Sequence, residues 1–247
     1  YKTSEIYSMA SEIERKYPIV RGNSLYSIVD GQSWTDAEAN ARAIGGNLAT
    51  INNAEENDFI LSQLDSSSHD LSRGGFWIGL NADLNGNWSW SNGDDVTYTN
   101  FIPGQGLITD YRPYINNSSS AEGQYVHILG PKAYEVGFIG DSPGEWNDMP
   151  NNPTTDIRWG SQYEINQGIA ETPFIRRGDS AYVVVEGPTW SEAEANAQKL
   201  GGHLVAINDS DENDWLVETF KDSNKSPYSA TDPYSPEVDI YWNGLRL

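Results

Sequence analysis

The pattern of hydrophobic and polar positions predicts a strand followed by a helix near the N-terminus. The segment SLYSIVDG at 24–31 is interpreted as a strand. The segment SWTDAEANARAIGG at 33–46 offers Ser33 or Thr35 as N-cap, fills its interior with alanines and ends at a glycine pair. Because glycine readily adopts the left-handed conformation that ends many helices, we expect a short helix to stop at Gly45.

A second helix is predicted after a short apolar strand, NLATI at 47–51. In the segment INNAEENDFILSQL at 51–64, Asn53 is the expected N-cap and Glu56 is placed to complete a capping box. The apolar residues of this segment recur on one helical face, which is typical of a helix that packs on a core. They are Phe59, Ile60 and Leu64.

From residue 76 onward the pattern changes to short strands separated by glycine, asparagine and aspartate turns. The expected strands are FWIGL at 76–80, GNWSWSNG at 86–93, VTYTNF at 96–101, QYVHIL at 124–129, GEWND at 144–148 and GIAETPF at 168–174. Two long segments, 102–124 and 129–145, are rich in small and polar residues, and such segments often serve binding. Two helices followed by a run of strands predict an α+β fold.

The chain contains an internal repeat. Residues 21–60 align with residues 177–216, and about half of the aligned positions are identical. The match continues as FWIGL at 76–80 against YWNGL at 241–245. A period this long excludes a solenoid and predicts tandem globular domains.

The repeat divides the chain into three parts. Residues 18–174 are expected to form one complete domain, and residues 175–247 the N-terminal half of a second one. Residues 1–17 are interpreted as a linker or as the terminal strand of a preceding repeat, because ASEIERKYPIVRG at 10–22 resembles GIAETPFIRRG at 168–178. We therefore expect the chain to be a window on a longer array.

Composition and charge exclude several kinds of partner. The formal net charge is -21 at pH 7, so nucleic acids and anionic membrane surfaces would repel the protein. No apolar run approaches a membrane span. The chain has no cysteine, which excludes disulfides and thiolate metal sites. Cation binding or simple solubility remains as the meaning of the acidic excess.

The spaced elements of residues 18–174 resemble those of the C-type lectin-like domain. In order they are WTDAEA, GGNLATI, EENDFI, FWIGL, NWSWSNG, TNFIPGQ, QYVHI, GEWNDMP and GIAE. The resemblance is specific because many elements occur in the right order, the WIGL strand and the W-N-D triplet being the strongest. It implies a double-looped α+β domain with two helices, two small antiparallel sheets and a long loop region that carries ligands.

This chain departs from the disulfide-bonded members of that family. The four positions that carry cysteine there are here Ala41, Tyr125, Asn151 and Ala170, and the family pairs the first with the last. Each lost bridge would cost about 2–5 kcal/mol, so apolar packing, a bound cation or neighbouring repeats must supply stability. Cysteine-free versions of the domain resemble those in secreted or surface proteins of bacteria, marine and cyanobacterial ones in particular, and in some phage proteins.

The resemblance also implies a candidate calcium site. In sugar-binding members, one calcium lies between a Glu-Pro-Asn or Gln-Pro-Asp triplet and the Asn-Asp of the W-N-D triplet, and the same oxygens direct sugar hydroxyls onto the ion. Here Asn147 and Asp148 match the second triplet, whereas Gln105, Gly106 and Leu107 stand at the first. Gly106 replaces the proline that shapes the loop, and leucine supplies no oxygen ligand. Gln105, Asn147 and Asp148 are the candidate calcium ligands.

One further candidate ligand-binding residue comes from the loop before the strand at 124–129. An acidic ligand that the family often supplies there falls on Gly123, and Glu122 is its neighbour. A shifted loop would bring Glu122 into the set of ligands.

Several of these residues and segments also have a purely structural interpretation. Trp146 fits a core residue that anchors a long loop, which we favour over a ligand contact. Asn147 and Asp148 fit turn-capping side chains equally well. The segment WSWSNGDD at 88–95 favours a half-buried strand over an aromatic sugar platform. DLNGN at 83–87 lacks the later glutamate of a calcium loop and is expected to be a turn.

An enzyme finds little support in the sequence. The three histidines, His69, His127 and His203, have no nucleophile or metal-ligand partner at a diagnostic spacing. No motif singles out a pair of carboxylates for glycoside hydrolysis.

The sequence thus predicts a tandem array that acts as a binding and adhesion module at an extracellular, cell-surface or virion-surface location. The expected ligand is a glycan or surface glycoconjugate, with calcium as a candidate cofactor. The alternative is a structural or protein-binding array that binds neither sugar nor calcium. Nucleic-acid binding and membrane insertion are not expected.

Overall fold

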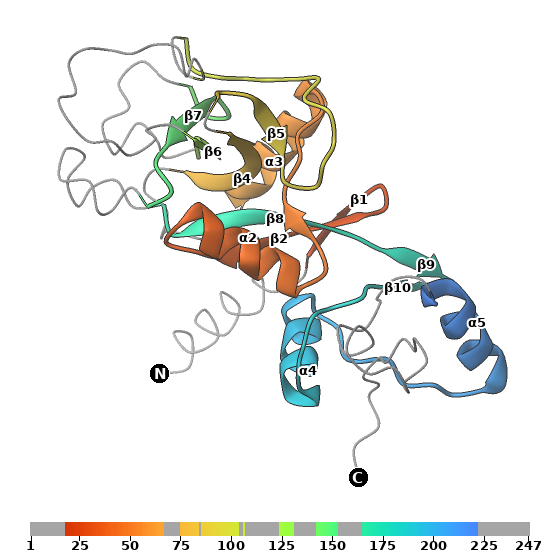
Figure 1. The fold of residues 1–247 in the computed structure, drawn as a ribbon. Helices are drawn as coiled ribbons and strands as arrows, with labels where there is room; N and C mark the ends of the chain where they lie inside the picture. The colour runs from red at the N-terminus through yellow and green to blue at the C-terminus, as the bar shows by residue number, and fades with distance from the viewer. Residues whose placement is uncertain are drawn as a thin grey trace, which may run out of the picture.

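The computed structural model describes residues 18–66, 75–83, 85–103, 106, 124–130, 142–152 and 165–221. Figure 1 shows a larger body, in which helices α2 (Trp34–Ala43) and α3 (Ala54–Ser66) flank a sheet, and a smaller body that follows it. The sheet strands are β1 (Ile19–Arg21), β2 (Ser24–Asp30), β3 (Asn47–Leu48), β4 (Phe76–Ala82), β5 (Trp88–Trp90), β6 (Tyr125–Ile128), β7 (Trp146–Met149) and β8 (Gln167–Pro173). The α+β prediction is confirmed.

The sheet brings distant parts of the chain together. Its main order is β1-β2-β8-β4-β6-β7, with β3 paired to β8 and β5 paired to β4. Strand β2 pairs antiparallel with β8 over its whole length, from Ser24 opposite Pro173 to Asp30 opposite Gln167. Gly168 lies where β8 meets α2, and a Cβ there would come within 3.1 Å of the Ala37 Cβ. Strands from the two ends of the body, β2 and β8, therefore lie side by side, and a glycine permits the close approach of the helix.

The first helix forms as its sequence predicts. Ser33 is the N-cap, and its hydroxyl accepts a hydrogen bond from the Asp36 N–H at 3.1 Å between Oγ and N. The helix gives way to Gly45, which adopts the left-handed conformation with φ +83°.

The second helix differs from prediction in one detail of its cap. Asn53 accepts the Glu56 N–H at 2.9 Å, as expected. The Glu56 carboxylate, however, accepts the N–H of Asn52 at 2.9 Å instead of closing the capping box on Asn53. Ile60 is buried and Phe59 packs against the core, while the Leu64 side chain lies outside the described residues.

Several predicted strands are shorter, and one is absent. The segment 96–101 forms no ladder, and its one bridge joins Phe101 to Trp146. Its apolar side chains pack against the core instead, Val96 and Tyr98 among them. The strand predicted at 47–51 is reduced to β3, and the strand predicted at 86–93 is reduced to β5.

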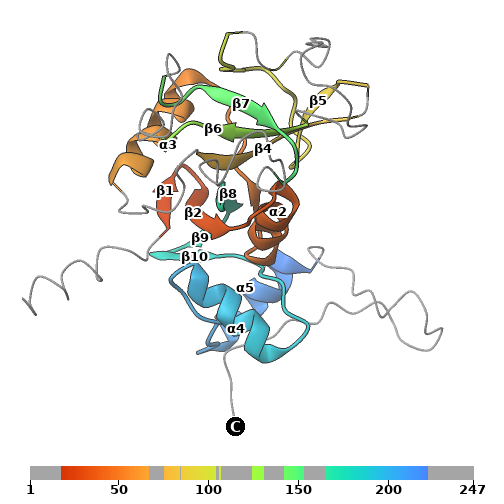
Figure 2. The ribbon, with the colours of Figure 1, turned by 90° about the vertical axis from the view of Figure 1, so that its left-hand side faces the viewer.

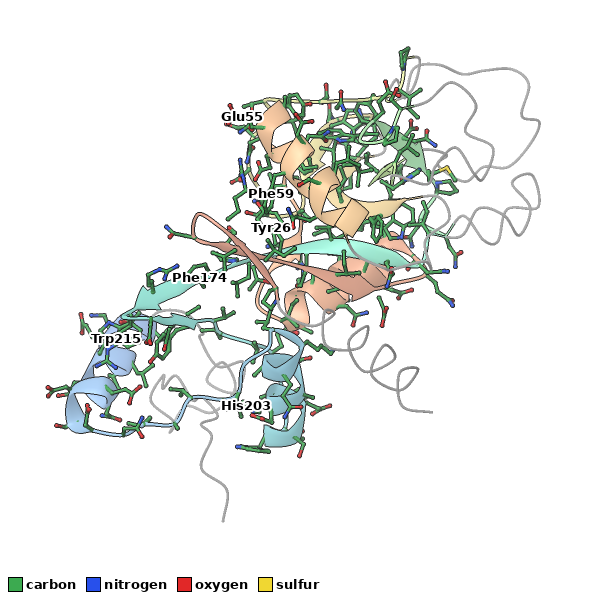
Figure 3. The ribbon with its side chains drawn as sticks, turned by 180° about the vertical axis from the view of Figure 1, so that it is seen from behind. Tyr26, Glu55, Phe59, Phe174, His203 and Trp215 are labelled. Atoms are coloured by element: carbon green, nitrogen blue, oxygen red, sulfur yellow. The ribbon has the colours of Figure 1, made fainter. Side chains whose placement is uncertain are left out.

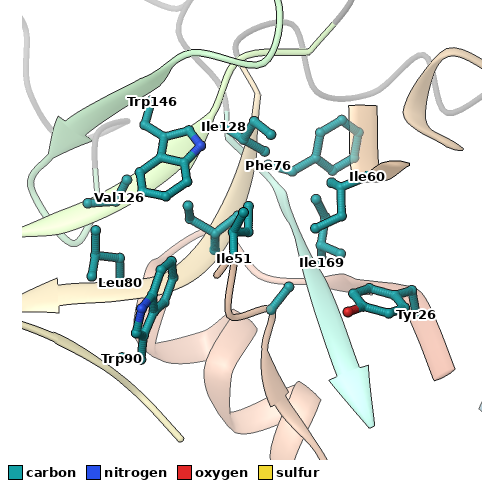
Figure 4. Packing of buried hydrophobic residues seen from close by; sticks show 12 residues of the cluster. Tyr26, Ile51, Ile60, Phe76, Leu80, Trp90, Val126, Ile128, Trp146 and Ile169 are labelled. Carbon is teal, nitrogen blue, oxygen red and sulfur yellow. The ribbon is translucent and has the colours of Figure 1, made fainter. Parts of the chain in front are cut away.

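The core is organised around one buried tryptophan. Trp146 has 0% of its surface exposed, and Figure 4 shows its indole beside Val126 on β6. The Trp90 ring meets the indole edge to face, with centroids 5.8 Å apart. Tyr98 and Phe101 meet the same indole edge to face, with ring centroids 5.6 and 5.8 Å away. The interpretation of Trp146 as a core anchor is confirmed.

Hydrogen bonds fix the depth and orientation of this indole. Its Nε1–H donates to the Asn57 Oδ1 at 2.8 Å. The Asn57 amide in turn donates to the Gly144 carbonyl at 3.0 Å, and the Asn100 amide donates to the same carbonyl at 2.9 Å. Helix α3, strand β7 and the segment before residue 102 are thus joined at one point.

The positions of the absent cysteines are filled by packing and polar contacts. Ala41 and Ala170 are both fully buried in a second core cluster, which also contains Trp77. The Tyr125 ring packs on Trp34, with centroids 5.0 Å apart. Asn151 holds the start of α2, because its Oδ1 accepts the Thr35 N–H at 3.0 Å and its carbonyl accepts the Trp34 N–H at 3.1 Å.

A buried carboxylate connects α3 to the first two strands. Glu56 is 5% exposed, and its Oε1 lies 2.8 Å from both the Arg21 guanidinium and the Tyr26 hydroxyl. Figure 3 shows Tyr26 next to Phe59 on α3, and their rings meet edge to face at 5.4 Å. Glu171 lies on the neighbouring strand, and burial raises its pKa above the ordinary value.

The smaller body repeats this network. It contains β9 (Ile175–Arg177), β10 (Ser180–Tyr182), α4 (Trp190–Lys199) and α5 (Ser210–Phe220). The Glu212 carboxylate lies 3.6 Å from Arg177, accepts the Tyr182 hydroxyl at 3.1 Å and accepts the Asn208 N–H at 2.9 Å. Trp215 takes the place of Phe59 against the tyrosine, with centroids 4.8 Å apart.

The two bodies are in direct contact. Only Phe174 separates β8 from β9, and Figure 2 shows β9 and β10 below α2 and above α4. The Glu186 N–H donates to the Ala43 carbonyl at 2.9 Å, and a Cβ at Gly45 would collide with the Val184 carbonyl. The C-terminal end of α2 therefore contacts the strand-like segment that follows β10. In the described part of the chain, no helix is both long and apolar enough to cross a membrane.

We expect Asn57→Ala to lower the free energy of unfolding by about 1–3 kcal/mol, because the buried Trp146 N–H loses its acceptor. Urea unfolding followed by tryptophan fluorescence measures the change. Asn92→Ala is the control, since Asn92 is exposed and bonds to the exposed Asp94; it should change stability by less than about 0.5 kcal/mol. Equal effects of the two substitutions would contradict the role given to Asn57.

Glu171 should make the protein less stable as the pH rises. Because its pKa in the folded state is raised, the folded protein holds this proton more tightly than the unfolded chain, so stability falls as the pH rises from 4.5 through the folded pKa. In urea unfolding between pH 4.5 and 8, Glu171→Gln should remove this part of the decline. The exposed Glu55→Gln should follow the wild type, and a wild-type slope in Glu171→Gln would disprove the assignment.

Candidate functional site

Strand β7 positions the two predicted residues of the W-N-D triplet. It pairs with β6, so that Asn147 lies opposite His127 and Asp148 opposite Val126. Asn147 is 8% exposed and Asp148 is half-buried. Trp146 fixes the beginning of this strand in the core. The backbone hydrogen bonds between β7 and β6 hold Asn147 and Asp148 in place.

Asp148 is joined to the start of the long-loop region. Its Oδ1 accepts the Gly106 N–H at 2.9 Å. The Gly106 carbonyl accepts the indole N–H of Trp88 on β5 at 3.0 Å. Burial raises the pKa of the Asp148 carboxyl, and the hydrogen bond from Gly106 opposes that shift. Both backbone polar groups of Gly106 are therefore bound by side chains of the sheet.

The conformation of Gly106 excludes most other residues. Its φ is +74°, in the left-handed region, and a Cβ would lie 2.6 Å from the Phe101 Cδ2. Proline has φ near −65° and lacks an N–H, so it could neither adopt this conformation nor donate to Asp148. The glycine at the middle of the first triplet thus specifies a different loop geometry from the one that proline shapes.

Asn147 faces a buried histidine across the ladder. His127 is 0% exposed, and burial lowers its pKa to about 3, so the imidazole is neutral at physiological pH. Its ring meets Trp77 edge to face at 6.1 Å. This environment suits a core residue and gives a substrate no route to the ring.

The structure does not place all of the predicted ligands. Gln105 and Glu122 lie outside the described residues, as does Leu107, and their roles stay predictions. Glu145, which precedes the triplet, is bound elsewhere: its Oε2 accepts the Ser142 N–H at 2.7 Å. Asp148 and Gly106 are the predicted positions that the structure brings into contact, and Asn147 precedes Asp148 on β7.

The described donors fit calcium poorly. Calcium takes six to eight oxygen ligands, and carboxylates usually supply several of them. Here one carboxylate oxygen of Asp148 accepts an N–H, and Asn147 is almost entirely buried. Among the residues that the structure describes, no three His, Cys, Asp or Glu side chains gather in a way that could hold a metal ion.

Other predicted features have structural roles. Asp83 caps its own turn by accepting the N–H groups of Asn85 and Asn87 at 2.8 and 2.9 Å, and these bonds lower its pKa to about 2. The DLNGN segment is therefore a turn, as predicted. Trp88 is a half-buried strand residue, also as predicted, and its ring packs on Phe101 at 5.3 Å.

The part played by Gly106 and Trp88 could not be found by matching motifs. The family pattern marks position 106 only as a missing proline, and the alternation of Trp88 and Trp90 indicates a strand without indicating its loop partner. The one usable signal was the glycine itself, because a glycine flanked by larger residues indicates an unusual backbone conformation.

Comparison with known proteins agrees with the fold. The family model described as "Lectin C-type domain" matches residues 30–155, just over half of the chain. The human C-type mannose receptor 2 is 28% identical over 243 residues, which is 95% of this chain and 14% of the receptor. The human secretory phospholipase A2 receptor is 26% identical over 204 residues, or 81% of this chain and 13% of the receptor. A perlucin-like protein of Mytilus galloprovincialis is 34% identical over 87 residues, or 34% of this chain and 53% of that protein.

Solved structures of related domains show lower similarity. The carbohydrate-recognition domain of cow CD23, solved in the presence of a GlcNAc2Man3 oligosaccharide, has 21% identity and a TM-score of 0.44, and the match covers 64% of this chain and 95% of that one. Human lithostathine has 19% identity and a TM-score of 0.44, with 63% and 96% covered.

The W-N-D strand, the two capped helices and the closed sheet thus occur together with a family match over most of the larger body. The named relatives are receptors and binding proteins, and C-type lectin domains are generally binding modules without catalytic activity. The chain belongs to the C-type lectin domain family.

Proposed function

We propose that this protein is an extracellular or surface-displayed module that binds glycans through the long-loop region beside β7. One observation carries the proposal: the retained Asn147-Asp148 pair lies on a strand fixed by the core, and Asp148 contacts the start of that region at Gly106. Membership of the C-type lectin domain family supports it, as does similarity to proteins named as mannose receptors. The chain spans 14% of the human receptor, so the activity of the whole protein is part of the proposal.

The chemistry of the site suits a neutral polyhydroxylated ligand. A half-buried carboxylate accepts hydrogen bonds from hydroxyl groups more strongly than a neutral oxygen does. The net charge of -21 would repel anionic ligands, whereas an uncharged sugar is not repelled. Gln105 and Glu122 are proposed to contribute further contacts, together with Asn147.

A second candidate function is a structural or protein-binding array that uses no sugar. The replacement of the first triplet by Gln105, Gly106 and Leu107 favours it, because this triplet supplies sugar ligands in other members. The retained second triplet favours the glycan.

We also propose that residues 18–174 form one domain and residues 175–247 the first half of a second, within a longer tandem array. The repeated network supports this division, since Arg21, Tyr26 and Glu56 recur as Arg177, Tyr182 and Glu212. Linked domains would raise a weak affinity for multivalent glycans through effective concentration. A location at the surface of a bacterium or phage particle also stays a prediction, and the relatives named above are animal proteins.

A glycan array tests the proposed function. We expect the protein to bind a limited set of neutral glycans, and Asp148→Ala to weaken this binding at least tenfold because it removes the central acceptor. Asp94→Ala is the matched control, since Asp94 is exposed and contacts only its own turn through Asn92. An array that stays blank with folded protein would favour the protein-binding alternative.

Hydrogen exchange tests the domain division. Arg21→Ala should raise amide exchange at least tenfold in α3 and leave α5 unchanged, because Arg21 contacts the carboxylate of the larger body only. Arg177→Ala should do the reverse. Exchange that rises in both helices for each substitution would mean that residues 18–221 unfold as one cooperative unit.

A further inference from the structure

We propose that Asp148 holds the start of the long-loop region by a direct hydrogen bond, and that this site binds its glycan without calcium. The second part rests on the proposed function; the first part does not. Side chains from β5, from β7 and from the segment 96–101 converge on Gly106, and few oxygens remain there for a cation.

Hydrogen bonds join the start of the loop to the sheet. In sugar-binding members the ion joins the loop triplet to the strand that carries the Asn-Asp pair. Here the Gly106 N–H reaches the Asp148 Oδ1 at 2.9 Å, and the Trp88 Nε1–H reaches the Gly106 carbonyl at 3.0 Å. The loop is therefore joined to β7 and to β5 without an ion between them.

The charge around the Asp148 Oδ1 disfavours a bound cation. The hydrogen of the Gly106 N–H carries partial positive charge and points at the Asp148 Oδ1, where a cation would otherwise bind. A calcium ion at that oxygen would have to displace the N–H or approach its positive end. The N–H takes up one acceptor position of the carboxylate at no cost in dehydrating an ion, and the carboxylate has other positions that can accept from a hydroxyl group.

Aromatic packing keeps Gly106 in place. A Cβ at this position would collide with the Phe101 ring, so the backbone lies directly on the aromatic face. Phe101 packs in turn on Trp88 at 5.3 Å and on Trp146 at 5.8 Å. The loop start is thus supported by the same aromatic core that anchors β7, and its position does not depend on a bound ligand.

A calcium ion at Asp148 would also need oxygen ligands from neighbouring side chains. Leucine at position 107 offers no side-chain oxygen, Asn147 is 8% exposed, and Glu145 bonds to the Ser142 backbone. Among the residues that the structure describes, Asp148 is a half-buried carboxylate bonded to Gly106, while Gln105 and Glu122 lie outside them. A sugar hydroxyl needs a single good acceptor, whereas calcium needs six or more oxygens, so this arrangement favours the hydroxyl.

Two substitutions at Asp148 separate a hydrogen-bond acceptor from a calcium ligand. Asp148→Asn keeps an oxygen that can accept the Gly106 N–H and removes the charge that calcium requires. Asp148→Ala removes both. On the full chain, three measurements are made: exchange of the Gly106 amide by NMR with and without EGTA, calorimetric titration with calcium chloride alone, and glycan binding in EGTA.

We expect the Gly106 amide to exchange slowly with or without EGTA, to stay protected in Asp148→Asn and to exchange at least tenfold faster in Asp148→Ala. Glycan binding should persist in EGTA, and Asp148→Asn should weaken it less than Asp148→Ala does, because the amide oxygen is a weaker acceptor than the carboxylate but still accepts. Saturable calcium binding that both substitutions abolish, or glycan binding that EGTA abolishes, would overturn the inference. Calcium binding that both variants retain would place the ion elsewhere, and glycan binding in EGTA would then decide.

The proposed function can fail separately. If no glycan binds in any buffer while the Gly106 amide behaves as expected and calcium gives no saturable heat at Asp148, the direct hydrogen bond stands and the glycan is wrong. If glycan binds only with calcium, the glycan stands and the calcium-free site is wrong.

Discussion

The burial of one indole, with its N–H satisfied, is the constraint on which most of this structure depends. Trp146 brings a large apolar surface into the core, where it meets Trp90, Tyr98 and Phe101. A buried indole N–H without an acceptor would cost free energy, and Asn57 on α3 supplies that acceptor. The helix, the sheet and the segment around residue 100 are thus fixed relative to one another. The position of Asp148, two residues further along the strand, follows from this anchor.

Several weaker contacts take the place of the disulfides, at the same four positions of the fold. The buried alanines at 41 and 170 close the contact between α2 and β8 with small apolar side chains. Tyr125 and Asn151 instead hold the first turn of α2, through a ring contact and backbone hydrogen bonds. A disulfide acts mainly by restricting the unfolded chain, whereas these contacts act in the folded state. The fold therefore depends on dense local packing and requires no oxidising compartment.

The carboxylate network of Glu56 recurs at Glu212, which identifies its contacts as essential to the fold of each body. In both bodies a buried glutamate on the second helix accepts from a tyrosine hydroxyl and from a backbone N–H, and it faces an arginine from the first strand. A buried charge is tolerable only when it is paired and hydrogen-bonded, so all three partners recur together. The aromatic residue against the tyrosine changes from Phe59 to Trp215, because either ring fills the same space.

Local signals in the sequence determined the secondary structure and the family. Caps such as Ser33 and Asn53, the glycine after α2 and the apolar run of β4 depend on neighbours in the chain, so they could be recognised without a structure. The tandem repeat is likewise a property of the sequence. The prediction at 96–101 was wrong because its pattern resembles a strand, whereas its pairing with β7 is limited to the backbone of Trp146, which bonds to Asn100 and Ile102.

Tertiary structure alone decided how the candidate site is held. The sequence places Asp148 and Gly106 forty-two residues apart, and nothing in their local patterns indicates that one accepts the N–H of the other. That contact exists because Phe101 supports the glycine, Trp88 binds its carbonyl and the Trp146 anchor sets the height of β7. Sequence periodicity reports which face of an element is buried, whereas the partner of a polar group depends on how separate elements pack.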